Sequence, residues 1–191
     1  MSAYPLNPNL RFVRGTKGGK IRMATVAWYE YAPAAAGAAT VLAATAMAET
    51  IPTVVISGFT TPDVPRVLSV KGNVAGVAGT VTITGFDANG TPISEELVLN
   101  GTTVVVGTKA FARVRTVVLP PRVAAGNTVS VGTGGKLGLW HALAADVRLQ
   151  TKFDGADDAG TLAIDVAVCK NLFTPAGTLD GVKPLRILYL V

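Results

Sequence analysis

Residues 79–99 read GTVTITGFDANGTPISEELVL. In the first half of this stretch Val81 and Ile83 alternate with threonines, which is the period of two expected of a half-buried β-strand. The Asn89-Gly90 pair is a turn signal, and residues 93–99 (ISEELVL) then form the returning strand of a predicted hairpin.

Turn-forming residues also separate short apolar runs on both sides of this hairpin. Short apolar or alternating runs recur about every ten residues between Gly, Pro and Asn, and this spacing predicts an all-β fold, a β-sandwich, jelly-roll-like body or barrel. The further predicted strands are 23–31, 53–56, 67–71, 102–106, 111–119, 128–131, 137–140, 146–153, 161–169 and 184–191.

Two segments are less clear. Residues 132–135 (GTGG) are expected to form a turn between strands. The Ala-rich residues 34–48 have good helical propensity, but Gly37 and several β-branched residues leave an extended conformation open.

The composition favours one domain that buries surface against other chains. The chain has 191 residues with 15% charged side chains, against about 25% in ordinary soluble domains. A single cysteine and a single histidine exclude a disulfide framework, a Cys-rich metal site and a multi-His zinc centre. A monomer so poor in charge would have difficulty covering its surface with polar groups.

The positive charge lies at one end of the chain. Of the 17 Lys and Arg residues, five fall within residues 1–22, and the other 12 equal the 12 acidic residues of the body, 23–191. We therefore divide the chain into an extended basic N-terminal arm, 1–22, and a neutral β body, with a motif block at 64–139 and C-terminal strands at 146–191. The five cations of the arm are Arg11, Arg14, Lys17, Lys20 and Arg22.

The arm has three possible roles. It could be a solvated tail, dock on an acidic partner surface, or bind nucleic acid. The last is disfavoured because only Tyr4 and Phe12 could stack on bases. We take the five cations as candidate partner-binding residues.

No targeting or membrane segment is expected. Residues 1–22 contain no apolar run of the kind a signal peptide needs. The longest uncharged stretch, 31–48, is mostly alanine and too weakly hydrophobic to span a membrane. We expect a soluble protein.

Motifs for chemistry are absent or incomplete. Residues 15–20 (GTKGGK) miss the P-loop spacing. His141, beside Trp140, and Cys169, in the apolar run 161–169, are expected to be structural. We find no catalytic constellation and expect no enzyme activity, cofactor, metal or small-molecule substrate.

Two groups of carboxylates leave alternatives open. Asp154, Asp157 and Asp158 lie in a Gly-flanked loop that is either solvated or a calcium site without EF-hand spacing. Glu95 shares strand parity with apolar neighbours, so it either meets Arg113 or Arg115 across the sheet or a bulge shifts the register.

The central block resembles a known class of proteins. Its motifs, in chain order, are 64–70 (VPRVLSV), 79–85 (GTVTITG), 87–96 (DANGTPISEE), 99–101 (LNG), 109–111 (KAF), 128–132 (TVSVG) and 136–139 (KLGL). This pattern resembles β-rich virion structural proteins of tailed bacteriophages. It covers somewhat over a third of the chain, and its motifs are those of turns and strands.

The resemblance implies a structural role. It favours a capsid decoration (cement) protein on the capsid exterior, made in the cytoplasm of a bacterial host. The implied partners are the major capsid protein and copies of the chain itself, as a homotrimer. A phage tail or head–tail connector component stays an alternative. A receptor- or carbohydrate-binding β-module is a further one, which would need an exposed cluster of Trp and Tyr.

Overall fold

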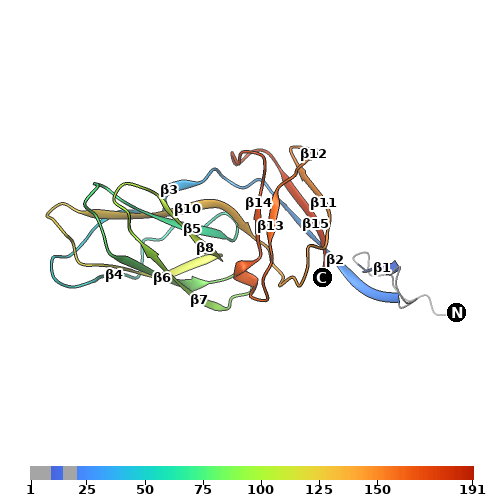
Figure 1. Cartoon of the computed structure of the whole chain (residues 1–191), viewed down its shortest axis with the longest axis horizontal. Coiled ribbons are helices and arrows are strands. Elements are labelled where there is room, and N and C mark those ends of the chain that lie inside the picture. The colour runs from blue at the N-terminus through green and yellow to red at the C-terminus, as the bar shows by residue number, and fades with distance from the viewer. Residues whose placement is uncertain (1–9, 15–20) are drawn as a thin grey trace.

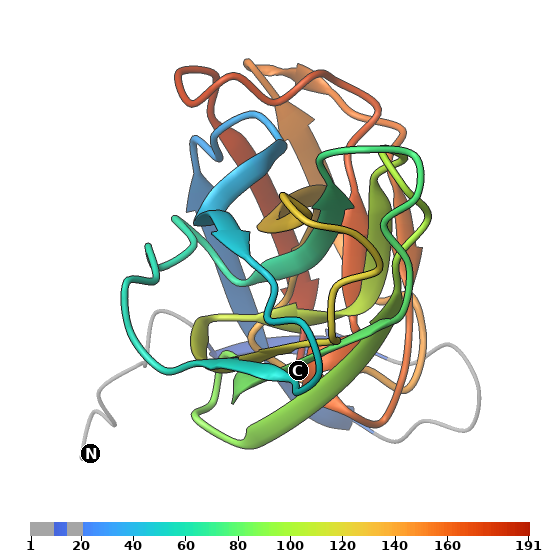
Figure 2. The same cartoon turned by 90° about the vertical axis from the view of Figure 1, so that its left-hand side faces the viewer.

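The computed structural model describes residues 10–14 and 21–191. The chain is almost entirely β, and its curled sheets form a half-barrel (Figures 1 and 2). The prediction of an all-β body of the sandwich or barrel type is confirmed.

Fifteen strands and one short 3-10 helix make up the described chain. In chain order they are β1 (Leu10–Arg14), β2 (Ile21–Tyr31), β3 (Gly37–Ala46), β4 (Thr53–Val55), β5 (Arg66–Gly72), β6 (Thr80–Phe86), β7 (Pro92–Val98), β8 (Val105–Phe111), β9 (Arg113–Leu119), β10 (Thr128–Gly138), β11 (Arg148–Phe153), β12 (Ala156–Asp157), β13 (Thr161–Ala163), η1 (Val168–Lys170), β14 (Leu172–Thr174) and β15 (Leu185–Leu190).

The first core lies between two sheets. A four-stranded sheet has the order β4-β9-β6-β7, and a six-stranded sheet has the order β13-β14-β10-β5-β8 with β3 also on β10. Inward side chains of the smaller sheet, such as Val81, Ile83 and Val117, pack against Leu68 and Val131 of the larger one. This is the arrangement of a β-sandwich, in which alternate residues of both sheets fill one core.

The hairpin at 79–99 forms as predicted. β6 and β7 pair antiparallel from Thr80↔Val98 to Phe86↔Pro92. Asp87 Oδ1 accepts hydrogen bonds from the backbone N–H groups of Asn89 and Thr91, both at 2.9 Å, and Gly90 has φ 78°. The turn therefore depends on an aspartate that organises the loop and a glycine that tolerates a positive φ.

A second core lies beside the first one. A five-stranded sheet, β1-β2-β15-β11-β12, covers it. Tyr29, Ile187 and Tyr189 of this sheet pack with Leu137 of β10 and Phe173 of β14. The apolar C-terminal run pairs as β15 between β2 and β11, so the strand predicted at 184–191 is confirmed.

Strand β10 joins the two cores, which corrects the turn expected at residues 132–135. The strand runs without interruption through GTGG, with Val131 in the first core and Leu137 in the second. Gly132 and Gly138 of this strand are needed for close packing rather than for a turn: a Cβ on Gly132 would collide with the backbone of Gly37, and one on Gly138 with Ala110.

The Ala-rich segment is extended and not helical. β3 pairs with β10 from Gly37↔Thr133 to Ala46↔Thr128, and its Val41 and Leu42 enter the first core. Small side chains allow this close approach to the glycines of β10, and the tertiary packing overrides the helical propensity of alanine.

The strand predicted at 161–169 is wrong beyond Ala163. There β13 ends, and a loop leads to η1, which contains Cys169. The buried amide of Asn171 bonds the backbone N–H and C=O of Asp165 and the C=O of Ala167. These backbone groups are satisfied by a side chain, so no neighbouring strand is required.

Candidate interaction surfaces

Strand β2 connects the N-terminal hairpin to the body. Its residues Ile21–Thr25 pair with β1, and Val26–Tyr31 pair with β15. Thr25 and Val191 exchange two backbone hydrogen bonds, at 3.1 and 2.9 Å, where the two pairings meet. The boundary between arm and body drawn after residue 22 thus falls within a continuous strand.

The five arm cations are only partly within the described chain. Arg11 and Arg14 belong to β1 and Arg22 to β2. Lys17 and Lys20 lie outside the described residues. Whether the arm contacts a partner stays a prediction.

A row of four charged residues crosses the body end of the five-stranded sheet. Glu30, Arg186, Lys152 and Asp157 are consecutive cross-strand neighbours on β2, β15, β11 and β12. Arg186 pairs with Glu30 at 2.7 Å and Lys152 with Asp157 at 3.9 Å. The hydrogen bond from Arg186 lowers the pKa of Glu30, and the same bond raises the pKa of Arg186.

Trp28 stands on this row as an exposed aromatic platform. Its Nε1 donates to Glu30 Oε2 at 2.7 Å, and the Arg186 guanidinium lies 5.0 Å from the ring centroid. The indole is still 59% exposed. Its only polar group is satisfied within the sheet, and its position is fixed by a cation–π contact.

An aromatic cavity of about 540 Å³ adjoins Trp28. It collects side chains from three separate parts of the chain, namely β2, the segment after β10, and β15. Its lining residues are Thr25, Val26, Ala27, Trp28, Tyr31, Trp140, His141, Tyr189 and Val191. Trp28 and the next residue, Tyr29, face opposite sides of β2, and Tyr29 is fully buried in the second core. The partners of Trp28 are instead Tyr31 and the distant Trp140.

His141 forms a hydrogen bond in this cavity. Its Nδ1 lies 2.9 Å from Tyr189 Oη. Burial lowers the pKa of His141 and raises the pKa of Tyr189 to about 12. Both groups are therefore neutral at pH 7, and the pair offers hydrogen bonds rather than an activated nucleophile.

Exposed aliphatic side chains gather at the opposite end of the body. Backbone hydrogen bonds join the loop after β3 to the loop before β10, through Met47 and Asn127 and through Ala48 and Arg122, and Asn73 joins Thr128. These three loops form one end of the molecule (Figure 1). They carry the exposed Ile51, Val74 and Val123, which we call the apolar tip. Exposed aliphatic residues on loops that lie together are candidates for a contact surface.

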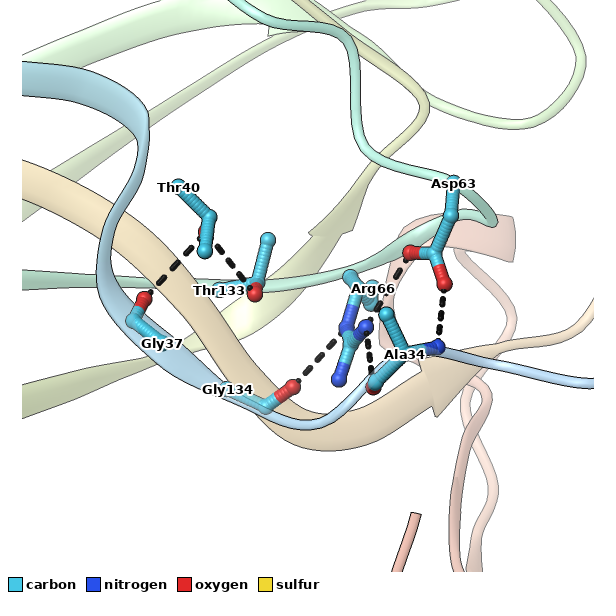
Figure 3. A network of polar contacts seen from close by, with 7 residues as sticks. All are labelled: Ala34, Gly37, Thr40, Asp63, Arg66, Thr133 and Gly134. Atoms are coloured by element: carbon cyan, nitrogen blue, oxygen red, sulfur yellow. Dashed lines mark hydrogen bonds and ion pairs between the residues drawn. The ribbon is translucent and has the colours of Figure 1, made fainter. Parts of the chain in front are cut away.

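Arg66 ties the connection after β2 to the centre of the body (Figure 3). It is 1% exposed, donates from Nε to Gly134 O and from Nη1 to Ala34 O, both at 2.9 Å, and pairs with Asp63 at 3.0 Å. Nearby, Thr40 Oγ1 lies 3.1 Å from Thr133 Oγ1. Burial and the charge of Asp63 raise the pKa of Tyr29 in the second core. The sequence predicted Arg66 only as part of a strand motif and did not predict that its buried guanidinium would join three segments of the chain.

Neither alternative predicted for Glu95 occurs, since β7 pairs with β6 without a bulge and no ion pair with either arginine forms. Glu95 faces inward, 8% exposed, but meets neither Arg113 nor Arg115. Its Oε1 accepts hydrogen bonds from the N–H and hydroxyl of Thr108, at 2.6 and 2.9 Å. Arg113 instead lies over the ring of Phe86, 4.6 Å from its centroid.

The three aspartates of the Gly-flanked loop serve separate purposes. Asp154 and Gly155, both with positive φ, form the turn between β11 and β12, and Asp157 pairs with Lys152. Asp158 accepts hydrogen bonds from the backbone of Gly160, Ala176 and Gly177. In the part of the chain that the structure describes, no three acidic, histidine or cysteine side chains form a group able to hold a metal ion.

Cys169 is buried as expected, although in η1 and not in a strand. Burial raises the pKa of its thiol, which keeps it protonated at neutral pH and a poor nucleophile.

No helix within residues 10–14 and 21–191 has the length and apolar character needed to cross a bilayer. Comparison with known proteins gave no match to any protein-family model, curated protein or solved structure.

Proposed function

We propose that this protein is a structural component of a tailed-bacteriophage virion, a capsid decoration protein that binds the exterior of the capsid lattice. It acts by burying surface against the major capsid protein and copies of itself, as a homotrimer, and not by catalysis.

The apolar tip is the observation that carries this proposal. Ile51 and Val123 are each 65% exposed and Val74 is 45% exposed, on loops that hydrogen bonds hold together. Residues 23–191 have twelve basic and twelve acidic side chains, so no net charge opposes the close approach of copies. A neutral body with an aliphatic end suits repeated contacts in an assembly.

The basic arm supplies the second contact. Its cations are separated in sequence from the neutral body, and β2 continues from the hairpin into the five-stranded sheet. A partner surface bearing carboxylates would attract the arm electrostatically, and the continuity of β2 would transmit that contact to the body.

The decisive test is copy number in purified virions, measured by quantitative mass spectrometry against the major capsid protein. We expect copies on the order of hundreds per particle, as a closed lattice of repeated sites requires. Copies sufficient only for one ring would favour the alternative, a tail or head–tail connector component. Absence of the chain from virions would contradict both.

The contribution of the arm is tested by co-sedimentation with undecorated shells of the same phage. Replacing its five cations by glutamine should abolish or strongly reduce binding and should remove the salt dependence of binding. The changed residues are Arg11, Arg14, Lys17, Lys20 and Arg22.

A matched control loses the same number of positive charges from the body. Its five glutamine substitutions should leave binding close to that of the unchanged protein, at Lys71, Arg115, Lys136, Lys170 and Lys183. If the two variants bind equally well, the arm is not the docking element.

A further inference from the structure

The exposed aromatic side chains of the described chain converge on one site. Trp28 and Tyr31, 59% and 43% exposed, are the aromatic members of its exposed large hydrophobic residues. Both line the cavity of about 540 Å³ that also contains Trp140, His141 and Tyr189. Aromatic rings left in contact with water at a concave surface are typical of binding sites.

The cavity lies on the part of β2 that pairs with β15. The preceding part of β2 pairs with β1, from Arg14↔Ile21 to Leu10↔Thr25. Thr25 directs its N–H and C=O to Val191. Since hydrogen-bonding direction alternates along an antiparallel strand, Val26 and Trp28 direct their backbone N–H and C=O groups to the other edge of β2, the one on which β1 lies.

Both faces of β2 carry an aromatic side chain at this cavity. Trp28 and Tyr31 lie on opposite faces of β2 by strand alternation, and both line the cavity. Trp28 is held by Glu30 and Arg186, as described above, and Tyr31 packs edge-on against the buried Tyr29 with ring centroids 4.9 Å apart. The aromatic surfaces are therefore in place before a ligand binds, which lowers the entropy cost of binding.

The polar side chains of the cavity are uncharged at neutral pH. Asp, Glu, Lys and Arg do not occur in its lining. The hydrogen-bonding groups are the hydroxyls of Thr25 and Tyr31, the indole N–H of Trp140, the ring of His141 and Tyr189 Oη. No side chain of the lining offers a charge opposite to that of a charged ligand.

We propose that this cavity is a binding site for a neutral saccharide. A pyranose ring presents an apolar C–H face, which stacks on an aromatic side chain, and a rim of hydroxyls that both donate and accept hydrogen bonds. The cavity offers both features: the rings of Trp28, Tyr31 and Trp140, and the hydrogen-bonding groups of Thr25 and His141. The site lies on the five-stranded sheet, away from the apolar tip, so both surfaces can be occupied at once.

The test uses the purified full-length protein and three neutral trisaccharides as probes: chitotriose, cellotriose and maltotriose. We expect at least one to bind with a dissociation constant of about 1 mM, measured by calorimetry and by a change in tryptophan fluorescence. Tyr31→Ala, Trp28→Ala and His141→Ala should each weaken that binding about tenfold, the loss of one stacking or hydrogen-bonding partner.

Ile56→Ala is the matched control, since Ile56 is 74% exposed and does not line the cavity. It should bind the saccharide like the unchanged protein. Circular dichroism of every variant separates loss of binding from loss of fold.

The proposal is overturned if none of the three saccharides binds, or if the three cavity variants bind as well as Ile56→Ala. It is also overturned if an extended apolar peptide occupies this edge and no saccharide does, as seen by amide shifts at Val26 and Trp28. None of these outcomes bears on copy number in the virion, so this proposal and the proposed capsid function fail independently.

Discussion

The Nε of Arg66 donates a hydrogen bond of 2.9 Å to the carbonyl oxygen of Gly134, at the place where β10 bulges away from β5. Between Thr133↔Leu68 and Leu137↔Arg66, β10 advances four residues while β5 advances two. The guanidinium occupies the space that this irregularity opens and satisfies a carbonyl that the ladder leaves unpaired.

Arg66→Leu should therefore destabilise the fold by about 3 kcal/mol, because the carbonyls of Gly134 and Ala34 and the carboxylate of Asp63 lose their partner. Urea unfolding followed by circular dichroism measures the change. Arg113→Leu is the control: Arg113 is exposed and its guanidinium lies over the Phe86 ring, so we expect a loss under about 1 kcal/mol. Equal losses in the two variants would mean that Arg66 does not hold the bulge.

The glycines of β10 allow a test within one strand. A Cβ at Gly132 would collide with the backbone of Gly37 and Ala38, whereas one at Gly135 would meet nothing within 4 Å. Gly132→Ala should cost about 3 kcal/mol by forcing β3 away from β10. Gly135→Ala should instead raise the free energy of unfolding by about 0.5 kcal/mol, since it restricts the unfolded chain. The midpoints of urea unfolding should thus move in opposite directions.

At Glu95, removing the charge and removing the hydrogen bonds should have different effects on stability. Its Oε1 accepts from Thr108, while its buried Oε2 has no partner. Glu95→Gln keeps an oxygen for Thr108 and removes a buried charge, so we expect stability to rise by about 1 kcal/mol. Glu95→Ala loses both bonds and should lower stability by about 2 kcal/mol. If both variants lower stability equally, the charge itself contributes to the fold.

His141 should give the protein a pH-dependent stability. Burial lowers its pKa below the ordinary 6.5, so the folded state favours the neutral ring. The unfolded state then binds the proton more readily, and stability that is complete above pH 6.5 is lost as the pH falls from there through the lower folded pKa. Carboxylates also titrate at lower pH, so the comparison is with His141→Gln. The difference in thermal midpoint between the two proteins should change between pH 7 and pH 5, and a constant difference would contradict this account.

The β6–β7 hairpin could be predicted because its signals are local. Alternation of Val81 and Ile83 with threonines chooses the buried face, and the turn chemistry of Asp87 and Gly90 sets the register between neighbouring strands. The C-terminal strand could also be predicted from the sequence, because an apolar run must pack against other residues to leave water.

The predictions were wrong where contacts between residues far apart in the sequence determine the local structure. Gly132 and its neighbours have the composition of a turn, but β3 lies so close to β10 that only glycine fits. Residues 164–169 have strand-like composition, but the buried amide of Asn171 forms hydrogen bonds with the backbone groups of Asp165 and Ala167 that a neighbouring strand would otherwise bind. Glu95 occupies a position in β7 that faces the core. The residue that donates hydrogen bonds to it there, Thr108, belongs to β8 of the other sheet.

The residues alone were sufficient for the all-β class, the strand spacing and the separation of a basic N-terminal segment from a neutral body, because alternation, turn residues and charge are local properties. The aromatic cavity, the apolar tip and the burial of Arg66 depend on which strands become neighbours. Trp28 and Trp140 are far apart in the chain, and only the pairing of β2 with β15 beside the end of β10 brings them to one cavity. Long-range pairing of this kind is set by the packing of the whole molecule, which no short stretch of sequence contains.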